Sequence, residues 1–443
     1  MSDYMFMLES HMRPQQFAVV QLVQAAAEQA ALNVFLVGGA MRDMLGGFPL
    51  HDVDFTVEGN PQKIVKHLVA KEGAVIVSEN PLRKSWELRF PSGVLSEIGM
   101  AHEAKYSKPA AKPVVTPATI HEDLRGRDFT INAIALSLNR TSRGLLIDPT
   151  NGQGDLEARE IRTTGNYSLY DDPARILRML RLKTRLGFEI SPRTQSQYEN
   201  VREAKLENKI TPAQLYKELR AMADEPNPAL LLETLEQEGL LSMFFPNFAG
   251  AKLNLAGHHK LLKLRQMVPF GAEFHSENLG LFLFVLTEKL SAKERTSLVK
   301  FLGIPKEDLG TTTKLDANSK KLESTLKSAK LNKASLVYQT LLAAPGEQVL
   351  YLAYKSTQRL VQDRIKKHLT QYLPGVLEIT EQEVVNWSNL NPDDPKFAQK
   401  RQDYILGRLD GRIRKPAPEP IPEPEPPQSG RMLRQPSAAR AVR

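Results

Sequence analysis

The pattern of apolar and polar residues predicts a small mixed sheet in the first third of the chain. Residues 17–31 repeat apolar side chains at the spacing of an amphipathic helix. Four shorter runs have the length and apolar content of strands: residues 33–37, 74–77, 86–90 and 144–147. We therefore expect a mixed sheet with helices on one side between residue 1 and about residue 147.

Strand signals nearly vanish after about Asp155, and helical spacing continues to about Arg412. Residues 230–241, 280–290 and 334–342 are clear examples of this spacing. The sequence therefore predicts an α+β protein in which a mixed-sheet head precedes a long all-helical region. Within the head, residues 105–117 are rich in proline and lysine, which predicts an extended loop.

Two further stretches are unusual in composition. Proline and glutamate dominate residues 415–424, and this composition cannot bury a core, so it predicts a disordered tail. A basic run lies within the helical region and is either a solvated face or a contact for RNA. It consists of Lys252, His258, His259, Lys260, Lys263 and Arg265.

The overall composition excludes several classes of protein and favours an anionic partner. The chain has 443 residues, a formal net charge of +8 and no cysteine. Disulfides, zinc-thiolate sites and cysteine nucleophiles are thereby excluded. The basic excess suits a partner with a phosphate backbone. No apolar run reaches membrane-spanning length and no signal pattern is present, which predicts a soluble cytoplasmic protein that does not enter a membrane.

A glycine turn follows the first predicted strand. The apolar run ends at Val37, Gly38 and Gly39 come next, and a helical pattern begins at Ala40. Glycines allow backbone N–H groups to approach a ligand closely, and the start of a helix favours an anion. Arg42, in the first helical turn, adds a forked donor suited to phosphate. This segment is therefore a candidate triphosphate site.

Two aspartates follow at alternate positions of a predicted strand. Asp52 and Asp54 project from one face of that strand, whereas Val53, Phe55 and Val57 fill the opposite face. Adjacent carboxylates repel each other unless a cation lies between them. Hard oxygen ligands in this arrangement suit Mg²⁺ ions that also contact substrate phosphates.

Two later segments complete a set of ordered motifs. Residues 127–133 read Arg-Asp-Phe-Thr-Ile-Asn-Ala, and residues 171–175 read Asp-Asp-Pro-Ala-Arg. Asp172 and Arg175 offer a carboxylate and a guanidinium to the edge of a base. Asp172 before Pro173 is also the pattern of a helix N-cap followed by proline at the first helical position. The local sequence is compatible with both roles.

Together these motifs resemble those of the class II tRNA nucleotidyltransferase and bacterial poly(A) polymerase family. The resemblance covers roughly the first half of the chain. It includes an Asp-Pro element with nearby glycines, which comprises Asp148, Pro149, Gly152, Gly154, Asp155 and Leu156. The resemblance implies a polymerase-beta-like nucleotidyltransferase head followed by a helical neck, body and tail. We place the head at 1–154, the neck at 155–225, the body and tail at 226–412 and the disordered segment at 413–443.

The same resemblance implies a role for each motif residue. Asp52 and Asp54 would bind the catalytic metal ions. The triphosphate, the sugar and the base would be contacted by Gly38, Gly39, Arg42, Arg127, Asp128, Asn132, Asp172 and Arg175. Arg178, Arg181 and Arg185, which follow along the same helix, would line this cleft or face water. Glu97, on a strand before residue 127, would assist the metal site or deprotonate the attacking hydroxyl.

This chain departs from the family pattern at three places. Gly126 replaces the first of two arginines that often precede the motif aspartate. His102 stands where many members have an arginine. Residues 211–214, which read Thr-Pro-Ala-Gln, align poorly with a Ser-x-Glu-Arg helix that helps to position the base-reading residues.

The implied activity is the metal-dependent addition of CMP and AMP, from CTP and ATP, to the 3′ end of tRNA. Three alternatives remain open: a CC-adding or A-adding enzyme, a poly(A) polymerase, and an inactive RNA-binding homologue. Residues 80–86 lack the Gly-Arg-Arg-Phe element that is usual in poly(A) polymerases of the family. The sequence predicts no particular oligomeric state.

Overall fold

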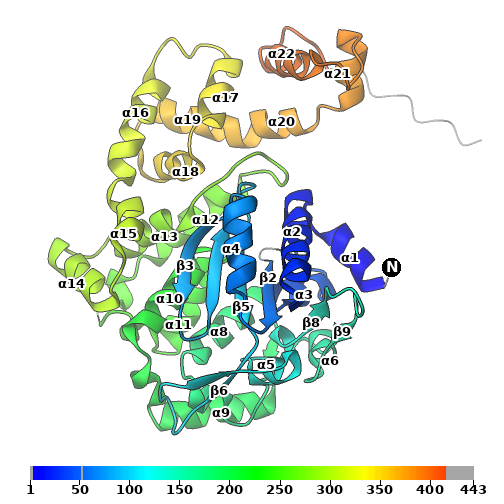
Figure 1. The fold of residues 1–443 in the computed structure, drawn as a ribbon. Coiled ribbons are helices and arrows are strands. Elements are labelled where there is room, and N and C mark those ends of the chain that lie inside the picture. Colours follow the sequence, from blue (N-terminus) through cyan, green and yellow to red (C-terminus); the bar gives the residue numbers. More distant parts are fainter. Residues whose placement is uncertain (1–2, 51–52, 247, 416–443) are drawn as a thin grey trace, which may run out of the picture. The chain divides into compact units, whose positions relative to one another are not determined.

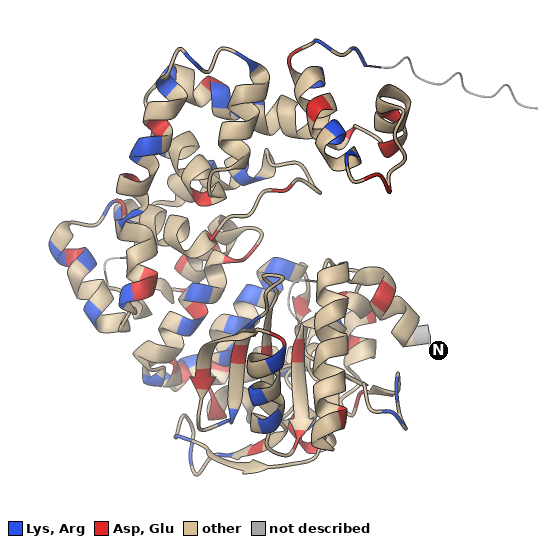
Figure 2. Cartoon of the chain, turned by 45° about the horizontal axis from the view of Figure 1, so that its top comes forward, with Lys and Arg blue, Asp and Glu red and all other residues tan. Residues whose placement is uncertain are grey.

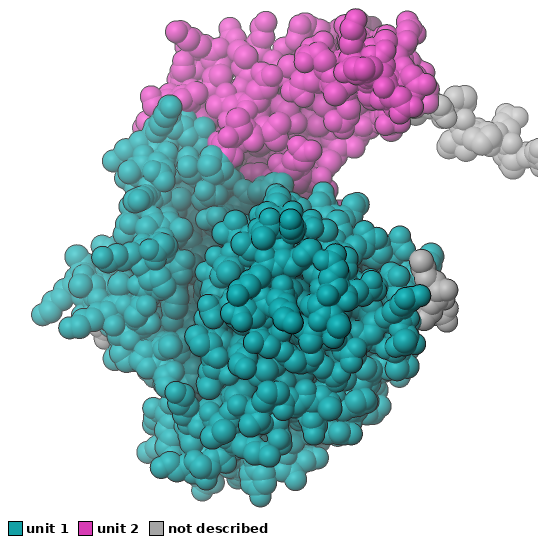
Figure 3. All heavy atoms as spheres, in the orientation of Figure 1, with its two compact units in different colours: residues 1–266, 275–322, 345–356 teal, residues 267–274, 323–344, 357–443 magenta. Residues whose placement is uncertain are grey.

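A computed structural model describes residues 3–50, 53–246 and 248–415 of the chain. It divides into two compact units (Figure 3). Unit 1 comprises Met1–Gln266, His275–Leu322 and Pro345–Ser356, and unit 2 comprises Met267–Phe274, Glu323–Ala344 and Thr357–Arg443. The predicted boundaries of head, neck, body and tail remain predictions, and residues 416–443 of the proline-rich tail lie outside the described residues.

A seven-stranded mixed sheet forms the head in unit 1 (Figure 1). Its spatial order is β3-β4-β5-β2-β1-β8-β9, and only β2 and β5 run parallel. The strands are β1 (Asn33–Val37), β2 (Asp54–Glu58), β3 (Val75–Asn80), β4 (Ser85–Arg89), β5 (Leu95–Met100), β8 (Ala135–Ser137) and β9 (Leu146–Ile147). The predicted strands therefore form one sheet.

Two long helices cover one face of this sheet. α2 (Pro14–Ala30) packs against α4 (Gln62–Lys71), and both lie over the strands in Figure 1. Phe55 and Val57 of β2 are buried in the core beneath them, together with Val53. The apolar alternation predicted around the aspartate pair is thus confirmed for these residues, and it leaves the opposite face of β2 for polar side chains.

The prediction that helices lie on one side of the sheet is incomplete. α5 (Ile120–Gly126) packs on the second face, where Leu124 joins Phe35, Val37 and Ala135 in a separate apolar cluster. The reason lies in β1, whose residues from Val34 to Val37 are all buried, so this strand needs cover on both faces.

The extended loop predicted at residues 105–117 is wrong in part. β6 (His102–Lys105) and β7 (Val114–Pro117) form an antiparallel pair, so only residues 106–113 connect them without strand structure. Val114 and Val115 supply the β-branched residues that favour the second strand despite the prolines nearby.

Helices make up nearly all of unit 1 after the head. In the described part of the chain, the later strands are two pairs of residues, β10 (Glu160–Ile161) and β11 (Glu189–Ile190). The helices are α6 (Gly152–Glu157), α7 (Ser168–Asp171), α8 (Arg175–Leu186), α9 (Pro192–Glu203), α10 (Pro212–Ala223), α11 (Pro228–Gln237), α12 (Leu255–Gln266), α13 (Asn278–Thr287), α14 (Ala292–Leu302), α15 (Lys306–Thr313) and α18 (Gly346–Lys355). The division between the units falls within α16 (Leu315–Lys327). The α+β prediction, a mixed-sheet head followed by helices, is confirmed.

The basic run, which apart from Lys252 lies on α12, is not one solvated face. His258 is buried against Phe282, and burial lowers its pKa to about 3. The Nζ atom of Lys260 donates to the carbonyl of Tyr354 at 2.5 Å. Lys and Arg residues are spread over both units and are interspersed with Asp and Glu (Figure 2). No helix in the described part of the chain is long and apolar enough to cross a membrane.

Unit 2 is helical and encloses an unusual histidine. Its elements include α17 (Ala334–Leu342), α19 (Arg359–Lys367), the π-helical turn η5 (His368–Tyr372), α20 (Leu373–Leu377), α21 (Glu381–Ser388) and α22 (Phe397–Leu409). His368 is fully buried, its ring lies 5.7 Å from that of Tyr338, and neither ring nitrogen has a hydrogen-bond partner among the described residues. Burial lowers its pKa to about 4.

We expect His368 to make unit 2 less stable in acid. Its pKa is lower in the folded chain than the ordinary value of about 6.5, so the unfolded chain takes up a proton first. Stability is therefore complete above about pH 6.5 and is lost as the pH falls toward 4. His368→Leu should remove this loss, which amounts to roughly 2 kcal/mol at pH 5.

Chemical denaturation between pH 4.5 and 7.5 measures this effect. The matched control is His121→Leu, which replaces an exposed histidine of α5 and should leave the pH dependence unchanged. A His368→Leu protein that still loses stability in acid as steeply as the unsubstituted chain would contradict the prediction.

Candidate nucleotide-transfer site

The glycine turn after β1 lies directly against the arginine of the second motif. Gly38 adopts a left-handed φ of 69°, which favours glycine, and α3 (Gly39–Leu45) follows it. A Cβ atom on Gly38 would lie 3.3 Å from Nη1 of Arg127, and one on Gly39 would lie 3.5 Å from Nη2 of Arg42. Arg127 therefore approaches closely at Gly38, where a side chain would be tight, whereas a Cβ on Gly39 would make only an ordinary contact with Arg42.

Arg42 is turned into the protein, which the sequence did not predict. Its Nε donates to Oδ1 of Asp43 at 2.8 Å, and its Nη1 donates to Oδ1 of Asn132 at 2.8 Å. Burial lowers the pKa of Arg42, although the neighbouring Asp43 opposes this shift. Arg42 thus joins α3 to the 3₁₀ turn η1 (Thr130–Asn132), and direct contact with a phosphate remains a prediction.

Arg127 connects α5 to the polar face of β2. Its Nε and Nη2 donate to Oδ2 of Asp123 at 3.0 and 2.9 Å, and Nη2 also donates to Oγ1 of Thr56 at 3.0 Å. Oδ1 of Asp123 accepts from the backbone N–H of His102 at 3.1 Å. These contacts place Arg127 between the glycine turn and the strand that carries Asp54.

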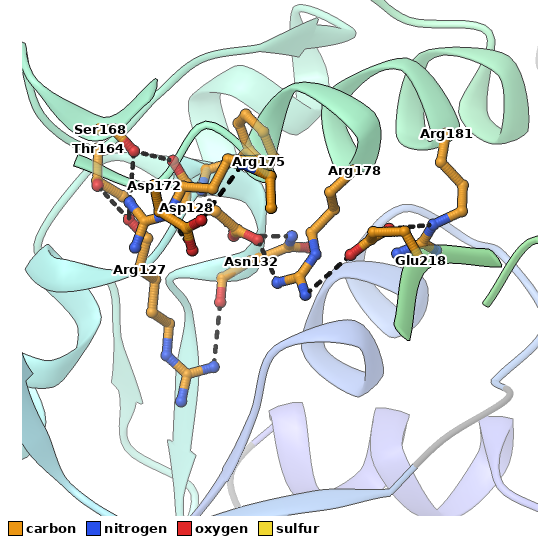
Figure 4. Close-up of polar contacts among 12 residues, drawn as sticks. Arg127, Asp128, Asn132, Thr164, Ser168, Asp172, Arg175, Arg178, Arg181 and Glu218 are labelled. Atoms are coloured by element: carbon orange, nitrogen blue, oxygen red, sulfur yellow. Dashed lines mark hydrogen bonds and ion pairs between the residues drawn. The ribbon is translucent and has the colours of Figure 1, made fainter. Parts of the chain in front are cut away.

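Asp128 is a buried carboxylate whose two oxygens are both hydrogen-bonded (Figure 4). Oδ1 accepts from Nδ2 of Asn132 at 3.1 Å and from the N–H of Phe129 at 2.7 Å. Oδ2 accepts from Nη1 of Arg178 at 2.8 Å. Burial would raise the pKa of Asp128, but Arg178 and Arg175 hold that pKa well below its usual range. Asp128 therefore carries its negative charge inside the protein.

A series of ion pairs extends from Asp128 along α8 (Figure 4). Arg178 lies 3.4 Å from Oε1 of Glu218, and Arg181 lies 3.2 Å from Oε2 of the same residue. Arg181 also pairs with Glu225 at 2.9 Å, and Arg185 lies 3.6 Å from Oδ2 of Asp43. These arginines therefore do not merely face water: they join α8 to α10 and to α3, and a place for them in the cleft remains a prediction.

Sequence reasoning overlooked Glu218. This residue lies among Leu215, Leu219 and Met222, which form the buried side of α10. A carboxylate on the apolar stripe of a helix is rarely buried without a partner, and that was the available signal. Burial lowers the pKa of Arg178 on its own, whereas Glu218 and Asp128 raise it above its ordinary value.

Asp172 and Arg175 lie side by side at the start of α8. Nη1 of Arg175 donates to Oγ of Ser168 at 2.5 Å and to the carbonyl of Arg127 at 3.3 Å. Nη2 donates to the carbonyl of Gly126 at 3.1 Å. Nε of Arg175 is 4.0 Å from Oδ2 of Asp172. The third motif is therefore held against the second.

The predicted N-cap lies slightly before the helix that it was expected to cap. α8 begins at Arg175, and the structure assigns its N-cap to Ala174. Oδ1 of Asp172 nevertheless accepts from the N–H of Ala174 at 3.3 Å, so it closes the turn that leads into α8. Proline at 173 allows this tight turn because it has no N–H to satisfy.

Asp54 and Glu97 occupy equivalent positions on neighbouring strands. The register of β2 against β5 pairs Phe55 with Ile98, so the two acidic residues precede this pair on the same face. The backbone N–H of Glu97 donates to Oδ1 of Asp54 at 2.9 Å, and the Glu97 side chain is exposed. Their carboxylates are hard oxygen ligands, which suit Mg²⁺.

Asp52, the other predicted metal ligand, lies outside the described residues. Among the residues that the structure does describe, no group of three or more histidine or acidic side chains is arranged to hold a metal ion. The donor chemistry of Asp54 and Glu97 fits a divalent cation, but a complete site requires Asp52, so metal binding remains a prediction.

The Asp-Pro element contacts the second motif through α6 and η1. Asp148 accepts from the N–H groups of Gly152 and Gln153 at 2.7 and 2.9 Å, which caps α6. Oδ2 of Asp155, on the same helix, accepts from Oγ1 of Thr130 at 2.6 Å. A Cβ atom on Gly152 would lie only 2.2 Å from the carbonyl oxygen of Thr130. Glycine is therefore required where α6 meets η1.

Gly152→Ala should displace η1 and destabilise the head by about 2 kcal/mol or more, because the added methyl overlaps a backbone oxygen. Chemical denaturation measures the change. Gly165→Ala is the control, since a Cβ there meets no atom within 4 Å and the backbone is not left-handed. Equal stabilities of the two variants would show that α6 does not fix η1.

Comparison with known proteins shows what this chain is similar to. A family profile described as "Poly A polymerase head domain" matches residues 34–162. An A-adding tRNA nucleotidyltransferase from Aquifex aeolicus is 30% identical over 353 residues, which are 79% of this chain and 41% of the relative. The A-adding enzyme of Geobacter sulfurreducens is 25% identical, with 92% of this chain and 47% of the relative covered.

A CC-adding tRNA nucleotidyltransferase from Deinococcus radiodurans is 36% identical over 205 residues, which are 46% of this chain and 53% of that protein. The chain spans about half the length of these curated relatives.

Solved structures share the fold. A CCA-adding enzyme in an apo form aligns with a TM-score of 0.52 and 23% identity, covering 93% of this chain and 96% of the other. A Thermotoga maritima CCA-adding enzyme complexed with tRNA aligns with a TM-score of 0.50 and 23% identity, covering 94% and 96%. Residues 34–162 of this chain therefore match a poly A polymerase head domain, and the chain as a whole is similar to tRNA nucleotidyltransferases.

Proposed function

We propose that this protein is a metal-dependent tRNA nucleotidyltransferase that adds CMP and AMP to the 3′ end of tRNA without a nucleic-acid template. One observation carries the proposal. The hydrogen bonds that Asn132 and Arg178 donate to Asp128 join the glycine-turn side of the head to α8, which begins at Arg175 and directly follows Asp172. The relatives that are tRNA nucleotidyltransferases support the substrate class.

In this proposal, Asp172 and Arg175 select the base. Both side chains are partly exposed, at 20% and 14%, and they sit at the end of a helix anchored by buried ion pairs. A carboxylate oxygen accepts from an exocyclic amine, and a guanidinium donates to ring or carbonyl acceptors. CTP and ATP both carry such an amine, so this pair of side chains suits both nucleotides.

The residues of the second motif would contact the sugar and phosphates. Arg127 keeps 23% of its side chain exposed, and its Nη1 lies beside Gly38. The hydrogen bond from Asn132 to Asp128 fixes both side chains and therefore defines the shape of this part of the site. Gly38 and Gly39 would admit the triphosphate close to the backbone, with Arg42 behind them.

Asp52 and Asp54 would hold divalent cations, which we propose to be Mg²⁺. When bound, such ions lower the pKa of an attacking hydroxyl and offset the charge on the phosphates. The terminal hydroxyl of the tRNA attacks the α-phosphate, its proton leaves, and the bond to pyrophosphate breaks. Glu97 is placed beside Asp54 and would receive that proton or complete the metal site.

Addition of A alone is a second candidate. Two relatives that match 79% and 92% of this chain are A-adding enzymes. CC addition, poly(A) synthesis and an inactive RNA-binding role are further alternatives, and each predicts a different outcome in the same assay.

The assay supplies three tRNA transcripts, which end before CCA, after the first C and after CC, with labelled CTP or ATP separately. A full CCA-adding enzyme should extend the first two with CTP and the third with ATP. An A-adding enzyme should extend only the third, and a CC-adding enzyme only the first two. A protein that extends none of them would overturn the proposal.

Asp54→Asn and Asp52→Ala test the metal assignment. Each should reduce incorporation at least about a hundredfold, because loss of a carboxylate ligand weakens stabilisation of the reacting phosphates by several kcal/mol. Asp363→Asn is the control, since Asp363 is an exposed residue of α19 in unit 2 and should leave the rate unchanged. Unchanged incorporation by Asp54→Asn would show that the assignment is wrong.

A further inference from the structure

The amide of Gln214, on the first turn of α10, has a fixed orientation. Its Oε1 accepts from the backbone N–H of Thr211 at 3.0 Å and from Oγ1 of the same residue at 2.9 Å. A backbone N–H can only donate, so the atom facing it must be the amide oxygen. The amide therefore cannot flip without losing its half of the capping box at the start of α10.

The other end of this amide faces the residue proposed to read the base. Nε2 of Gln214 donates to Oδ1 of Asp172 at 3.0 Å, and the N–H of Ala174 donates to the same oxygen at 3.3 Å. Oδ1 therefore has two donors. Oδ2 lies 4.0 Å from Nε of Arg175, which is longer than a hydrogen bond.

The two oxygens of Asp172 therefore have different roles. The hydrogen bonds to Oδ1 hold the side chain in place. Oδ2 lies on the side of Arg175, and the Asp172 side chain keeps 20% of its surface exposed. An oxygen in this position accepts a hydrogen bond from the exocyclic amine of cytosine or adenine and meets the carbonyl of uracil as a second acceptor.

We propose that Gln214 is a positioning residue for base selection: by donating to one oxygen of Asp172, it presents the other oxygen to the amine of the incoming nucleotide. This inference rests on the proposed function and specifies how the base-reading pair is held. A neutral amide suits this position because it carries both a donor and an acceptor. Its N–H group donates to Asp172 while its oxygen accepts from Thr211.

The sequence around Gln214 gives a reason to expect that Asp172 is positioned in a way particular to this chain. Residues 211–214 depart from the Ser-x-Glu-Arg pattern that the family resemblance led us to look for. At the last of these positions the chain has a glutamine, which brings no charge to a site where Arg175 and Arg178 already lie close to acidic groups. Gln214 therefore orients Asp172 without competing for it as an ion-pair partner.

Gln214→Glu tests this inference, because it keeps the size of the side chain and replaces the donor by an oxygen. Two carboxylates in contact repel each other or share one proton, and in both cases Asp172 presents a changed edge. Single-nucleotide addition is measured with matched pairs that differ at the exocyclic group, CTP against UTP and ATP against inosine triphosphate, using whichever natural nucleotide the unsubstituted protein adds.

We expect the ratio of kcat/KM for the amine over the carbonyl nucleotide to fall about tenfold or more, as for loss of a hydrogen bond that involves a charged group. Damage to the fold alone would lower both rates together and leave this ratio unchanged. Gln214→Met is the second variant. It lacks the donor but adds no charge, so it should lower the ratio in the same direction even if the glutamate variant folds poorly.

Gln195→Glu is the matched control. Nε2 of Gln195 donates to Oε1 of Glu199 at 2.8 Å on the exposed side of α9, so the same substitution creates the same carboxylate contact away from the site. Its ratio should equal that of the unsubstituted protein.

The outcomes separate the two proposals. If the unsubstituted protein extends no tRNA, the proposed function is wrong and this inference is overturned with it. If the protein extends tRNA but both Gln214 variants keep the original ratio, only the role of Gln214 is overturned. A lowered ratio in both variants and not in Gln195→Glu supports it.

Discussion

The packing around the candidate site depends on the buried carboxylate of Asp128. An ionised carboxylate away from water is stable only where cations and hydrogen-bond donors compensate for its lost hydration. Asp128 meets this requirement with Arg178 on one oxygen and with Asn132 and a backbone N–H on the other. Because Arg178 belongs to α8, the requirement can be met only when the head and the neck helices are packed together.

The same logic explains why so many arginines near the site point inward. Arg42, Arg178 and Arg181 have lost much of their contact with water, and each has found an acidic or amide partner on another element. Such contacts contribute modestly to the free energy of folding, but removal of one partner leaves the other charge buried and without compensation. The arrangement thus favours a single geometry over several similar ones, which suits the base selection that we propose.

Local sequence patterns predicted the features that depend on neighbours along the chain. The alternation around Asp54 gave the correct face of β2, and the glycine turn appeared where β1 ends. Features that depend on distant residues were not predictable in this way. The inward turn of Arg42 depends on Asn132, and the importance of Glu218 depends on α8, which approaches α10 only in the folded protein. The β6–β7 pair was overlooked because its prolines resemble a loop.

The position of Asp128 has a consequence for how the chain can be divided. A fragment that ends at residue 154 would contain every strand of the large sheet and all the residues of the glycine turn. It would also keep Asp128 but lose both Arg178 and Arg175, the cations that hold its pKa low. Such a fragment would keep Asp128 buried without either arginine, so the interior of the head is fully compensated only when α8 is packed against it.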